Sequence, residues 1–356
     1  MYNDTLSKMD EFVIRVLCIG DPHLKKSAVA EYQHMISEIL KVAIKASPDI
    51  IIVLGDTLHD KENIKTRALS DAIRFFKDLS KIATTVVLIG NHDREVERGF
   101  DFDIHPFVGI ERSDSFDVLI ANRIDTISVG NLKFVLIPYI QPGELHNELS
   151  KAGIDMNEIK PTACFAHQEI RGCIMKCFQK RMYQQVSQIG DIWPNDYPLL
   201  ISGHIHKRHK PQTNVHYVGT PRQIDVDEDE NKGVTIYDFY SSGEVKDKLI
   251  KLRIPPKRIV EIHVSELDSY SPPPDVKIEL RIKGTYEEVK SFMNSLVVKK
   301  LRKLGVVVKA SPEILSIEKS KMYTKFERLS HIDILRELLS DDEVGLQVLD
   351  HLLKAG

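Results

Sequence analysis

Five short segments of the chain carry the side chains that proteins use to bind divalent metal ions. In chain order the candidate ligands are Asp21 and His23, Asp56, Asn91 with the adjacent His92, His167, and His204 with His206. Four of the segments follow a short apolar run rich in branched residues, which predicts a buried strand that ends at the polar side chains. Carboxylate, amide and imidazole groups bind Mn²⁺, Fe²⁺ or Zn²⁺, and the shortage of cysteine argues against a structural zinc cluster. The set favours two metal ions that act in phosphoester hydrolysis.

The spacing within two of the segments has a geometric reason. Side chains two residues apart on an extended strand point the same way, so Asp21 can act with His23, and His204 with His206. One such pair is a weak signal, because a lone histidine at a strand end more often makes an ordinary hydrogen bond. Five segments in this order, each at the end of a predicted strand, favour a metal centre.

With these motifs the chain resembles the calcineurin-like metallophosphoesterases, and within them the SbcD-type nuclease subunits of recombination, including phage and viral members. The narrower resemblance is carried by a histidine shortly after the second motif, a His-Gln pair, and an acidic stretch after the last motif. These are His59, His167-Gln168, and Tyr217–Pro221 followed by Asp225–Glu230. Phosphoprotein phosphatases of the superfamily usually have an arginine-containing motif at the first of these places. The specific resemblance covers about residues 12–250.

The resemblance implies a role for each residue of the set. One metal ion would be bound by Asp21, His23 and His206, the other by Asn91, His167 and His204, and Asp56 would bridge the two. His92 would not be a ligand, but would stabilise charge on the phosphate or protonate the leaving oxygen. Asp93 would orient the His92 imidazole, and His59 would position the substrate nucleotide. The expected cofactors are two divalent metal ions, with Mn²⁺ as the expected metal, and the sequence leaves open which histidine donates the proton.

The resemblance also implies the fold, an α/β four-layer α/β/β/α sandwich with a small α/β capping domain and C-terminal helices. We predict a metallophosphoesterase nuclease domain at residues 1–254, a basic α/β DNA-binding cap at 257–322 and a helical partner-binding segment at 329–356. Pro255-Pro256 marks the first boundary.

Local patterns predict the elements within these domains. Helices are predicted near residues 27–46, 64–82 and 171–189, and strands at 117–121, 124–129 and 132–138 form a predicted meander. The cap is predicted to contain strands at 259–264, 275–283 and 305–317 and one helix at 285–303. Cys173 and Cys177 have helical spacing, which we interpret as a partly buried helix face rather than a metal site.

Length and composition restrict the class of protein. With 356 residues, 42% of them hydrophobic, the chain can bury a large core in two or three domains. No segment approaches the roughly 18 apolar residues of a membrane span, and the first residues do not resemble a signal peptide. The four cysteines do not suggest a disulfide framework, so we expect a cytoplasmic, reducing location, in the host if the protein is viral, and no membrane contact.

The net charge of −3 hides a basic region. Lys and Arg outnumber Asp and Glu over residues 251–330, most densely at Lys299–Lys303. Such a region suits a nucleic-acid surface, because Lys and Arg neutralise backbone phosphates. A charge run alone is as often a solvated face. The expected substrate is DNA, both double-stranded ends and single strands.

The C-terminal segment is acidic and rich in leucine, with Ser330 and Ser340 placed as helix N-caps. In the family this region binds an SbcC-type, SMC-like ATPase at the base of its coiled coil, although an amphipathic helix pair equally suits packing on its own domain. The resemblance further implies a homodimer within a heterotetramer. The helix that carries Tyr32, Met35, Ile36 and Ile39 is a candidate dimer surface.

These observations lead to three hypotheses about function. The first is a Mn²⁺-dependent DNA exonuclease and endonuclease, acting 3′-to-5′ on DNA ends with the ATPase in recombination, repair or replication. The second is a small-molecule phosphodiesterase or phosphoprotein phosphatase on the same scaffold, against which His59 and the basic cap stand. The third, a catalytically silent scaffold, is the weakest because the full ligand set and His92 are present.

Overall fold

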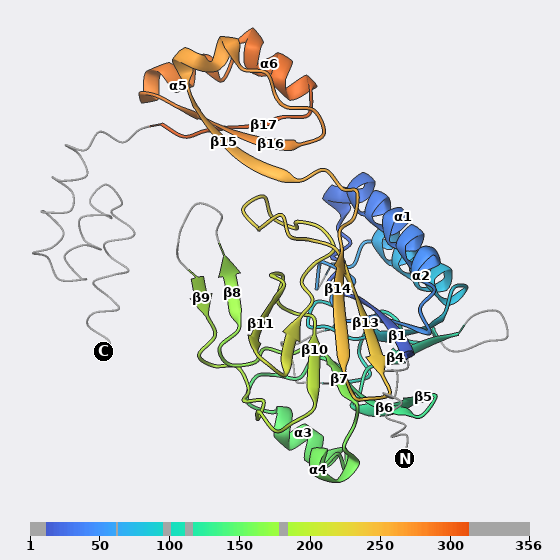
Figure 1. The fold of residues 1–356 in the computed structure, drawn as a ribbon. Coiled ribbons are helices and arrows are strands. Elements are labelled where there is room, and N and C mark those ends of the chain that lie inside the picture. The colour runs from blue at the N-terminus through green and yellow to red at the C-terminus, as the bar shows by residue number, and fades with distance from the viewer. Residues whose placement is uncertain (1–11, 62, 95–100, 111–116, 178–183, 313–356) are drawn as a thin grey trace, which may run out of the picture. The chain divides into compact units, whose positions relative to one another are not determined.

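A computed structural model describes residues 12–61, 63–94, 101–110, 117–177 and 184–312. The chain divides into two compact units, Met1–Arg258 with Asp275–Lys277, and Ile259–Pro274 with Ile278–Gly356 (Figure 1). The predicted C-terminal helices at 329–356 lie outside the described residues. No helix of the described part is long and apolar enough to cross a membrane.

The first unit contains two six-stranded sheets, of which the first has the order β14-β13-β1-β2-β3-β4. Four of its strands are parallel neighbours and two are antiparallel additions at one edge. The parallel strands are β1 (Phe12–Ile19), β2 (Ile50–Val53), β3 (Thr84–Leu88) and β4 (Val118–Ala121), and the additions are β13 (Val234–Tyr240) and β14 (Val245–Ile250). Because β2 is buried on both faces, its sequence is a continuous apolar run rather than an alternating one.

The second sheet has the order β11-β12-β10-β7-β6-β5. Its strands are β5 (Asp125–Val129), β6 (Leu132–Ile137), β7 (Ala163–Ala166), β10 (Leu199–Ser202), β11 (His209–Gln212) and β12 (Val215–Tyr217). Strands β6, β7, β10 and β12 are parallel neighbours, whereas β5 and β11 pair antiparallel at the two edges.

Three apolar clusters define the layers of the first unit. The helices α1 (Val29–Ala46), preceded by the short η1 (Lys26–Ala28), and α2 (Thr66–Ser80) pack on the outer face of the first sheet. A second cluster fills the space between the sheets, and a third joins the second sheet to α3 (Leu145–Lys151) and α4 (Met156–Ile159). Successive residues of β1 pack into different clusters: the side chain of Leu17 packs toward the helices and that of Val16 toward the other sheet. The predicted four-layer α/β/β/α sandwich is confirmed.

The second unit is a small α/β structure with strand order β15-β16-β17. Its elements are β15 (Lys257–His263), which begins in the first unit, η2 (Val264–Ser269), β16 (Lys277–Lys283), α5 (Tyr286–Phe292), α6 (Leu296–Lys303) and β17 (Val307–Ala310). The single helix predicted at 285–303 is two helices, because the Ser295 side chain accepts a hydrogen bond from the Val298 amide and starts α6.

Three further expectations about the core domain were wrong. Residues near 171–189 form strands β8 (Ile174–Cys177) and β9 (Gln184–Val186) instead of a helix, so the two cysteines do not share a helix face. The predicted meander is divided between the sheets, since β4 joins the first sheet while β5 and β6 form a hairpin in the second. Tyr32, Met35 and Ile39 are buried in the core of the chain itself and form no free dimer surface.

The carboxylate of Glu31 on α1 joins several distant parts of the first unit. Its oxygens lie 2.7 Å from Arg222 Nη1, 2.9 Å from Lys257 Nζ and 2.6 Å from Lys277 Nζ. Burial alone would raise the pKa of Glu31, but hydrogen bonds from Lys277 and Lys257 and the charge of Arg222 outweigh it and lower the pKa to about 2. Lys257 and Lys277 flank the points where the chain enters and leaves the second unit.

Replacing Glu31 should therefore destabilise the protein in a pH-dependent way. A carboxylate whose pKa falls on folding stabilises the folded state above its ordinary pKa of 4.5, and this contribution disappears as the pH falls toward about 2. We expect Glu31→Gln to lower the free energy of unfolding by about 3 kcal/mol at pH 7, measured by urea denaturation. The difference from the wild type should shrink between pH 4.5 and 2, whereas Glu158→Gln on the exposed side of α4 should change little at any pH. A difference in the free energy of unfolding between the wild type and Glu31→Gln that stays constant over this pH range would contradict the prediction.

Candidate metal centre

The five motifs meet where strands of both sheets end. Asp21 and His23 follow β1, Asp56 follows β2, Asn91 and His92 follow β3, His167 follows β7, and His204 and His206 follow β10. These strands are parallel within each sheet, so their carboxyl ends lie at one edge and deliver the loops to a common place. The structure thus brings together all the residues that the sequence predicted as ligands.

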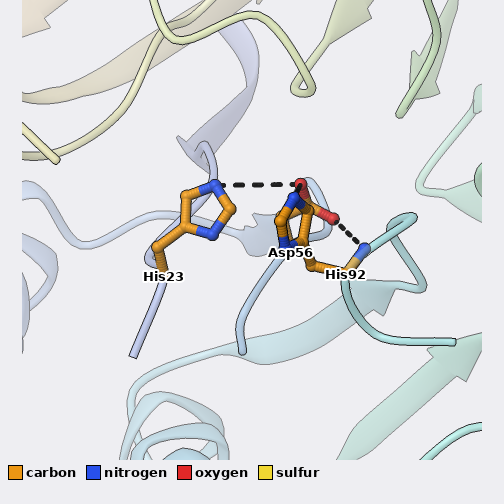
Figure 2. Close-up of side chains that lie close together, drawn as sticks. All are labelled: His23, Asp56 and His92. Atoms are coloured by element: carbon orange, nitrogen blue, oxygen red, sulfur yellow. Dashed lines mark hydrogen bonds and ion pairs between the residues drawn. The ribbon is translucent and has the colours of Figure 1, made fainter. Parts of the chain in front are cut away.

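The Asp56 carboxylate lies between two histidines of the first sheet. His23 Nε2 is 3.8 Å from Asp56 Oδ2, and His92 Nε2 is 3.9 Å from the same oxygen. Figure 2 shows His23 turned toward this carboxylate, whose other oxygen accepts a 2.7 Å hydrogen bond from the His92 amide. The three side chains are close enough to surround one metal ion, so proximity alone also admits His92 as a ligand.

Further ligand atoms converge beside His23. Its Nε2 lies 3.0 Å from His206 Nε2, although two neutral imidazoles can share only one proton at such a contact. Asp21 Oδ1 accepts a 3.0 Å hydrogen bond from the His204 amide, while Asp21 Oδ2 is buried without a hydrogen-bond partner among the described residues. Two facing ring nitrogens and a buried acceptor oxygen fit a bound cation. We call this group of side chains the His23–His206 half of the centre.

The other half of the centre is built from Asn91, His167 and His204. Asn91 Oδ1 lies 3.1 Å from His167 Nε2 and 3.0 Å from His204 Nδ1, and these two nitrogens are 3.3 Å apart. His167 Nδ1 donates a 2.6 Å hydrogen bond to the Leu54 carbonyl, which leaves Nε2 to face the site. His167 Nε2 is also 3.3 Å from Asp56 Oδ1. Asp56 therefore belongs to both groups of potential ligands, as a bridging carboxylate must.

The backbone at the centre has little freedom. His23, Asp56 and His204 have φ angles of 47°, 48° and 73°, in the left-handed region that residues other than glycine rarely adopt. A Cβ atom on Gly90 would lie 2.2 Å from Asp56 Oδ1 and 2.3 Å from the Asp56 amide. The glycines in these motifs thus let neighbouring loops approach the ligands closely.

Asp56 and the histidines around it shift one another's pKa values. Burial would raise the pKa of Asp56, but the charge of His167 and a hydrogen bond with it hold that pKa well below its usual range. Burial lowers the pKa of His167, yet the Asp56 charge outweighs this and raises it to about 9. Burial also keeps the pKa of His23 well below its usual value, so its imidazole is neutral. On binding a divalent cation His167 would give up its proton, and the buried carboxylate with the converging imidazoles would then form its ligand set.

His59 and His92 occupy one border of the centre. His92 Nδ1 donates a 2.6 Å hydrogen bond to the His59 carbonyl, and the two rings are stacked with centroids 5.8 Å apart. Because a carbonyl can only accept, the Nδ1 proton is fixed and Nε2 is the nitrogen of His92 that can exchange a proton in the site.

Contrary to the expectation from the family resemblance, no hydrogen bond or ion pair joins Asp93 to the His92 imidazole among the described residues. Its buried carboxylate accepts hydrogen bonds from the amides of Thr57, Leu58 and Gly90 at 3.1, 2.9 and 3.2 Å. Asp93 thereby joins the loop after β2 to the loop after β3 and satisfies three backbone donors that water cannot reach. The His59 carbonyl orients the imidazole instead.

Two carboxylates that were not predicted as site residues also contact the histidines. Glu228 Oε1 lies 2.7 Å from His206 Nδ1, and Glu169 Oε2 lies 3.9 Å from His204 Nε2. Burial would raise the pKa of Glu228, but hydrogen bonds with His206 and Lys232 lower it to about 2. The acidic stretch that contains Glu228 was visible in the sequence, but nothing in it distinguished this residue from its neighbours.

A family profile and two viral relatives show the family of the chain. The profile of the family "Calcineurin-like phosphoesterase" matches residues 14–208. A phosphoesterase-named protein of Invertebrate iridescent virus 6, 244L, is 32% identical over 290 residues, which are 80% of this chain and 99% of that protein. Another of Invertebrate iridescent virus 3, 078R, is 30% identical over 333 residues, 91% of each chain. Among solved structures, Yfce, a phosphoesterase from E. coli, aligns with a TM-score of 0.31 and 10% identity over 67% of this chain and all of that one.

The fold and the converging ligands define a metal-dependent hydrolase of phosphate esters. The family match and the two viral relatives show that the chain belongs to the calcineurin-like phosphoesterase family.

The contacts of Asp93 predict a structural phenotype for its replacement. Asp93→Asn keeps the shape of the side chain but turns an amide group toward backbone donors, which should lower the free energy of unfolding by about 1–3 kcal/mol in urea denaturation. Asp196→Asn, in an exposed turn, is the matched control and should change little. Unchanged stability together with an altered pH profile of activity would instead support an effect on His92.

Proposed function

We propose that this phosphoesterase is a Mn²⁺-dependent DNA nuclease of the SbcD type, with 3′-to-5′ exonuclease and endonuclease activity. The observation that carries the proposal is the pairing of His59 with His92 next to the shared Asp56 carboxylate. His59 comes from the loop after β2, and its ring centroid lies 5.2 Å from that of His23. A histidine here, rather than the phosphatase arginine, supports a role in positioning a nucleotide.

The surroundings of His59 support a polyanionic substrate. His59 borders a surface hollow of about 490 Å³ that is also lined by Lys25, Lys26, Ser27 and Asp60. Lys26 is exposed and Lys25 half-buried, and neither makes an ion pair within the described residues. Unpaired ammonium groups beside the centre suit the next phosphates of a strand whose scissile group lies at the metals. On α6 of the second unit, Lys299, Lys300, Arg302 and Lys303 are exposed around the buried Leu301, which favours a second phosphate contact.

The side chains of the centre can share the chemistry as follows. Asp21, His23 and His206 would hold one cation, Asn91, His167 and His204 the other, and Asp56 both. When bound, the cations supply activated water and neutralise the phosphate oxygens. His92, with Nδ1 fixed by the His59 carbonyl, can deliver a proton from Nε2 to the leaving 3′ oxygen. His59 would hold the nucleotide next to the scissile bond.

We extend the proposal to the partners and the location of the protein. An SbcC-type, SMC-like ATPase would bind the acidic C-terminal segment, and two copies of the chain would pair within a heterotetramer that processes DNA ends in recombination, repair or replication. The host cytoplasm is the proposed location, in keeping with viral relatives and with Cys18, Cys164 and Cys173 as buried free thiols.

A small-molecule phosphodiesterase or a phosphoprotein phosphatase is the alternative, and one observation favours it. A second hollow of about 430 Å³ beside His92, His204 and His206 has more acidic than basic residues in its lining, which includes Asp225, Asp227, Glu228, Asp229, Lys207 and Lys232. Acidic side chains repel a polyanion, so a strand of DNA would have to approach from the His59 side, whereas a small phosphoester could enter from either side.

Digestion of end-labelled DNA tests the proposal directly. We expect Mn²⁺ to support 3′-to-5′ degradation of duplex and single-stranded DNA, EDTA to abolish it, and His92→Gln to lower the rate by 10²–10⁴-fold, the usual contribution of general acid catalysis. His92→Gln should still bind two Mn²⁺ ions, since loss of one would make His92 a ligand instead of a proton donor. His59→Ser should reduce exonuclease activity more than endonuclease activity. Intact DNA with rapid turnover of p-nitrophenyl phosphate would overturn the nuclease proposal in favour of the alternative.

The lysines near His59 should contribute through charge. We expect Lys25→Gln/Lys26→Gln to weaken binding of duplex ends and to lower the slope of log affinity against log salt concentration by up to about 2, because each phosphate contact contributes about 0.9. Fluorescence anisotropy in Ca²⁺ at several salt concentrations measures both effects. Lys45→Gln/Lys248→Gln removes two exposed charges outside the hollow and is the control. Equal salt slopes for the two double variants would exclude a phosphate site at the hollow.

A further inference from the structure

The segment 221–233, within the loop between β12 and β13, contacts both histidines of the His23–His206 half of the metal centre. We call it the bracket loop. It contains the acidic stretch and reaches His206 through a carboxylate and His23 through a guanidinium. These two histidines come from different sheets, β10 and β1, and face each other with their Nε2 atoms 3.0 Å apart.

Glu228 of the bracket loop fixes the His206 imidazole. Its Oε1 accepts a 2.7 Å hydrogen bond from His206 Nδ1, so the Nε2 lone pair points into the centre. Glu228 Oε2 accepts from the Ile224 amide at 3.1 Å and pairs with Lys232 Nζ at 3.0 Å. Lys232 Nζ in turn donates to the His206 carbonyl at 2.7 Å, so both ends of His206 are held. The side chains of Glu228 and Lys232 are only 14% and 7% exposed, which makes these contacts strong.

Arg222 of the same loop holds the backbone of His23. Its Nη2 donates a 3.0 Å hydrogen bond to the His23 carbonyl, and its Nη1 lies 2.7 Å from Glu31 Oε1. The guanidinium is 1% exposed, and His23 has the left-handed φ of 47°. A strained backbone persists only where neighbouring groups fix it, and Arg222 supplies that constraint.

The two contacts act as one unit because the loop is braced internally. Gln223 Nε2 donates to the carbonyls of Glu228 and Lys257 at 2.8 and 3.0 Å, and Gln223 Oε1 accepts from the Lys257 amide at 2.6 Å. Movement of Glu228 would therefore disturb the segment next to Arg222.

The other half of the centre is supported from elsewhere. His167 Nδ1 is held by the Leu54 carbonyl at 2.6 Å. His204 Nε2 lies 3.9 Å from Glu169, which accepts a 2.5 Å hydrogen bond from Ser187 Oγ. No hydrogen bond or ion pair between the bracket loop and the side chains of Asn91, His167 or His204 occurs among the described contacts.

We propose that the bracket loop sets the affinity of the His23–His206 half for its divalent cation, independently of the other half. Glu228 and Arg222 are positioning residues: one orients His206 and increases its basicity, and the other fixes His23. This inference rests on the two-metal site of the proposed function and adds control of one metal position. Carboxylate partners of metal-binding histidines typically change metal affinity 10–100-fold.

Titration with Mn²⁺ alone, by calorimetry and by electron paramagnetic resonance, tests the proposal on the full-length protein. The wild type should bind two ions and show a spin-coupled pair at saturation. Glu228→Ala and Arg222→Met should weaken one binding step 10–100-fold and give an uncoupled Mn²⁺ signal at intermediate concentrations. His206→Ala, which lacks a ligand, identifies the step that belongs to this half. Glu228→Gln keeps a hydrogen-bond acceptor but not the charge. Its Mn²⁺ affinity at this step should lie between those of the wild type and Glu228→Ala.

Two controls separate positioning from general effects. Asp227 lies in the bracket loop, and no described hydrogen bond joins it to His206. Asp227→Asn removes its charge and should leave both Mn²⁺ binding steps unchanged. Glu169→Gln should weaken the Mn²⁺ binding step that belongs to the other half of the centre, which contains His204. Thermal unfolding of the metal-free variants checks folding, and Glu228→Gln, with the same shape as glutamate, provides the comparison if Glu228→Ala is unfolded.

The outcomes distinguish this inference from the proposed function. Fewer than two Mn²⁺ ions bound by the wild type would overturn the two-metal site itself. Two ions bound by the wild type, with both steps unchanged in Glu228→Gln and Arg222→Met, would overturn only the role of the bracket loop. Equal weakening of both steps in a folded Glu228 variant would also overturn it, because the two halves would then not be independent.

Discussion

The buried carboxylate of Asp56 is the constraint on which the rest of the centre depends. Its side chain is 3% exposed, and its oxygens face His23, His92 and His167 from three different loops. A charge in this position is unfavourable unless positive or polar groups surround it closely. The close approach of Gly90, the left-handed backbone of Asp56 and the carboxylate clamp of Asp93 all serve to bring those loops within reach.

The packing between the two sheets determines whether the halves of the centre form at all. Each half combines ligands from both sheets, since His23 meets His206 and Asn91 meets His167. In the layer between the sheets, the ring centroid of Phe134 lies 5.3 Å from that of Phe165 and 5.3 Å from that of Phe239. Close packing of this kind fixes the distance between the sheets, and thereby the spacing of the ligands that each sheet delivers.

The two sides of the centre differ in charge, and this difference bears on how a substrate approaches. Lys25 and Lys26 border the His59 side, while the acidic residues of the bracket loop border the His206 side. Glu228 contacts His206, and its neighbours Asp225, Asp227 and Asp229 line the second hollow. Under the proposed function, this one loop would hold a metal ligand in place and discourage a polyanion from entering on its side.

The sequence by itself determined the order of the candidate ligands and the helices α1 and α2, because strand ends and helical periodicity are local signals. The four-layer class followed from the resemblance to a known family. The sequence did not determine that β4 joins the first sheet, that residues 174–186 contain two strands, or that Asp93 clamps backbone amides. Nor did it distinguish Glu228 and Arg222, whose partners lie 22 and 199 residues away in the chain. Such contacts depend on which loops the packed sheets bring together, so only the tertiary structure decides them.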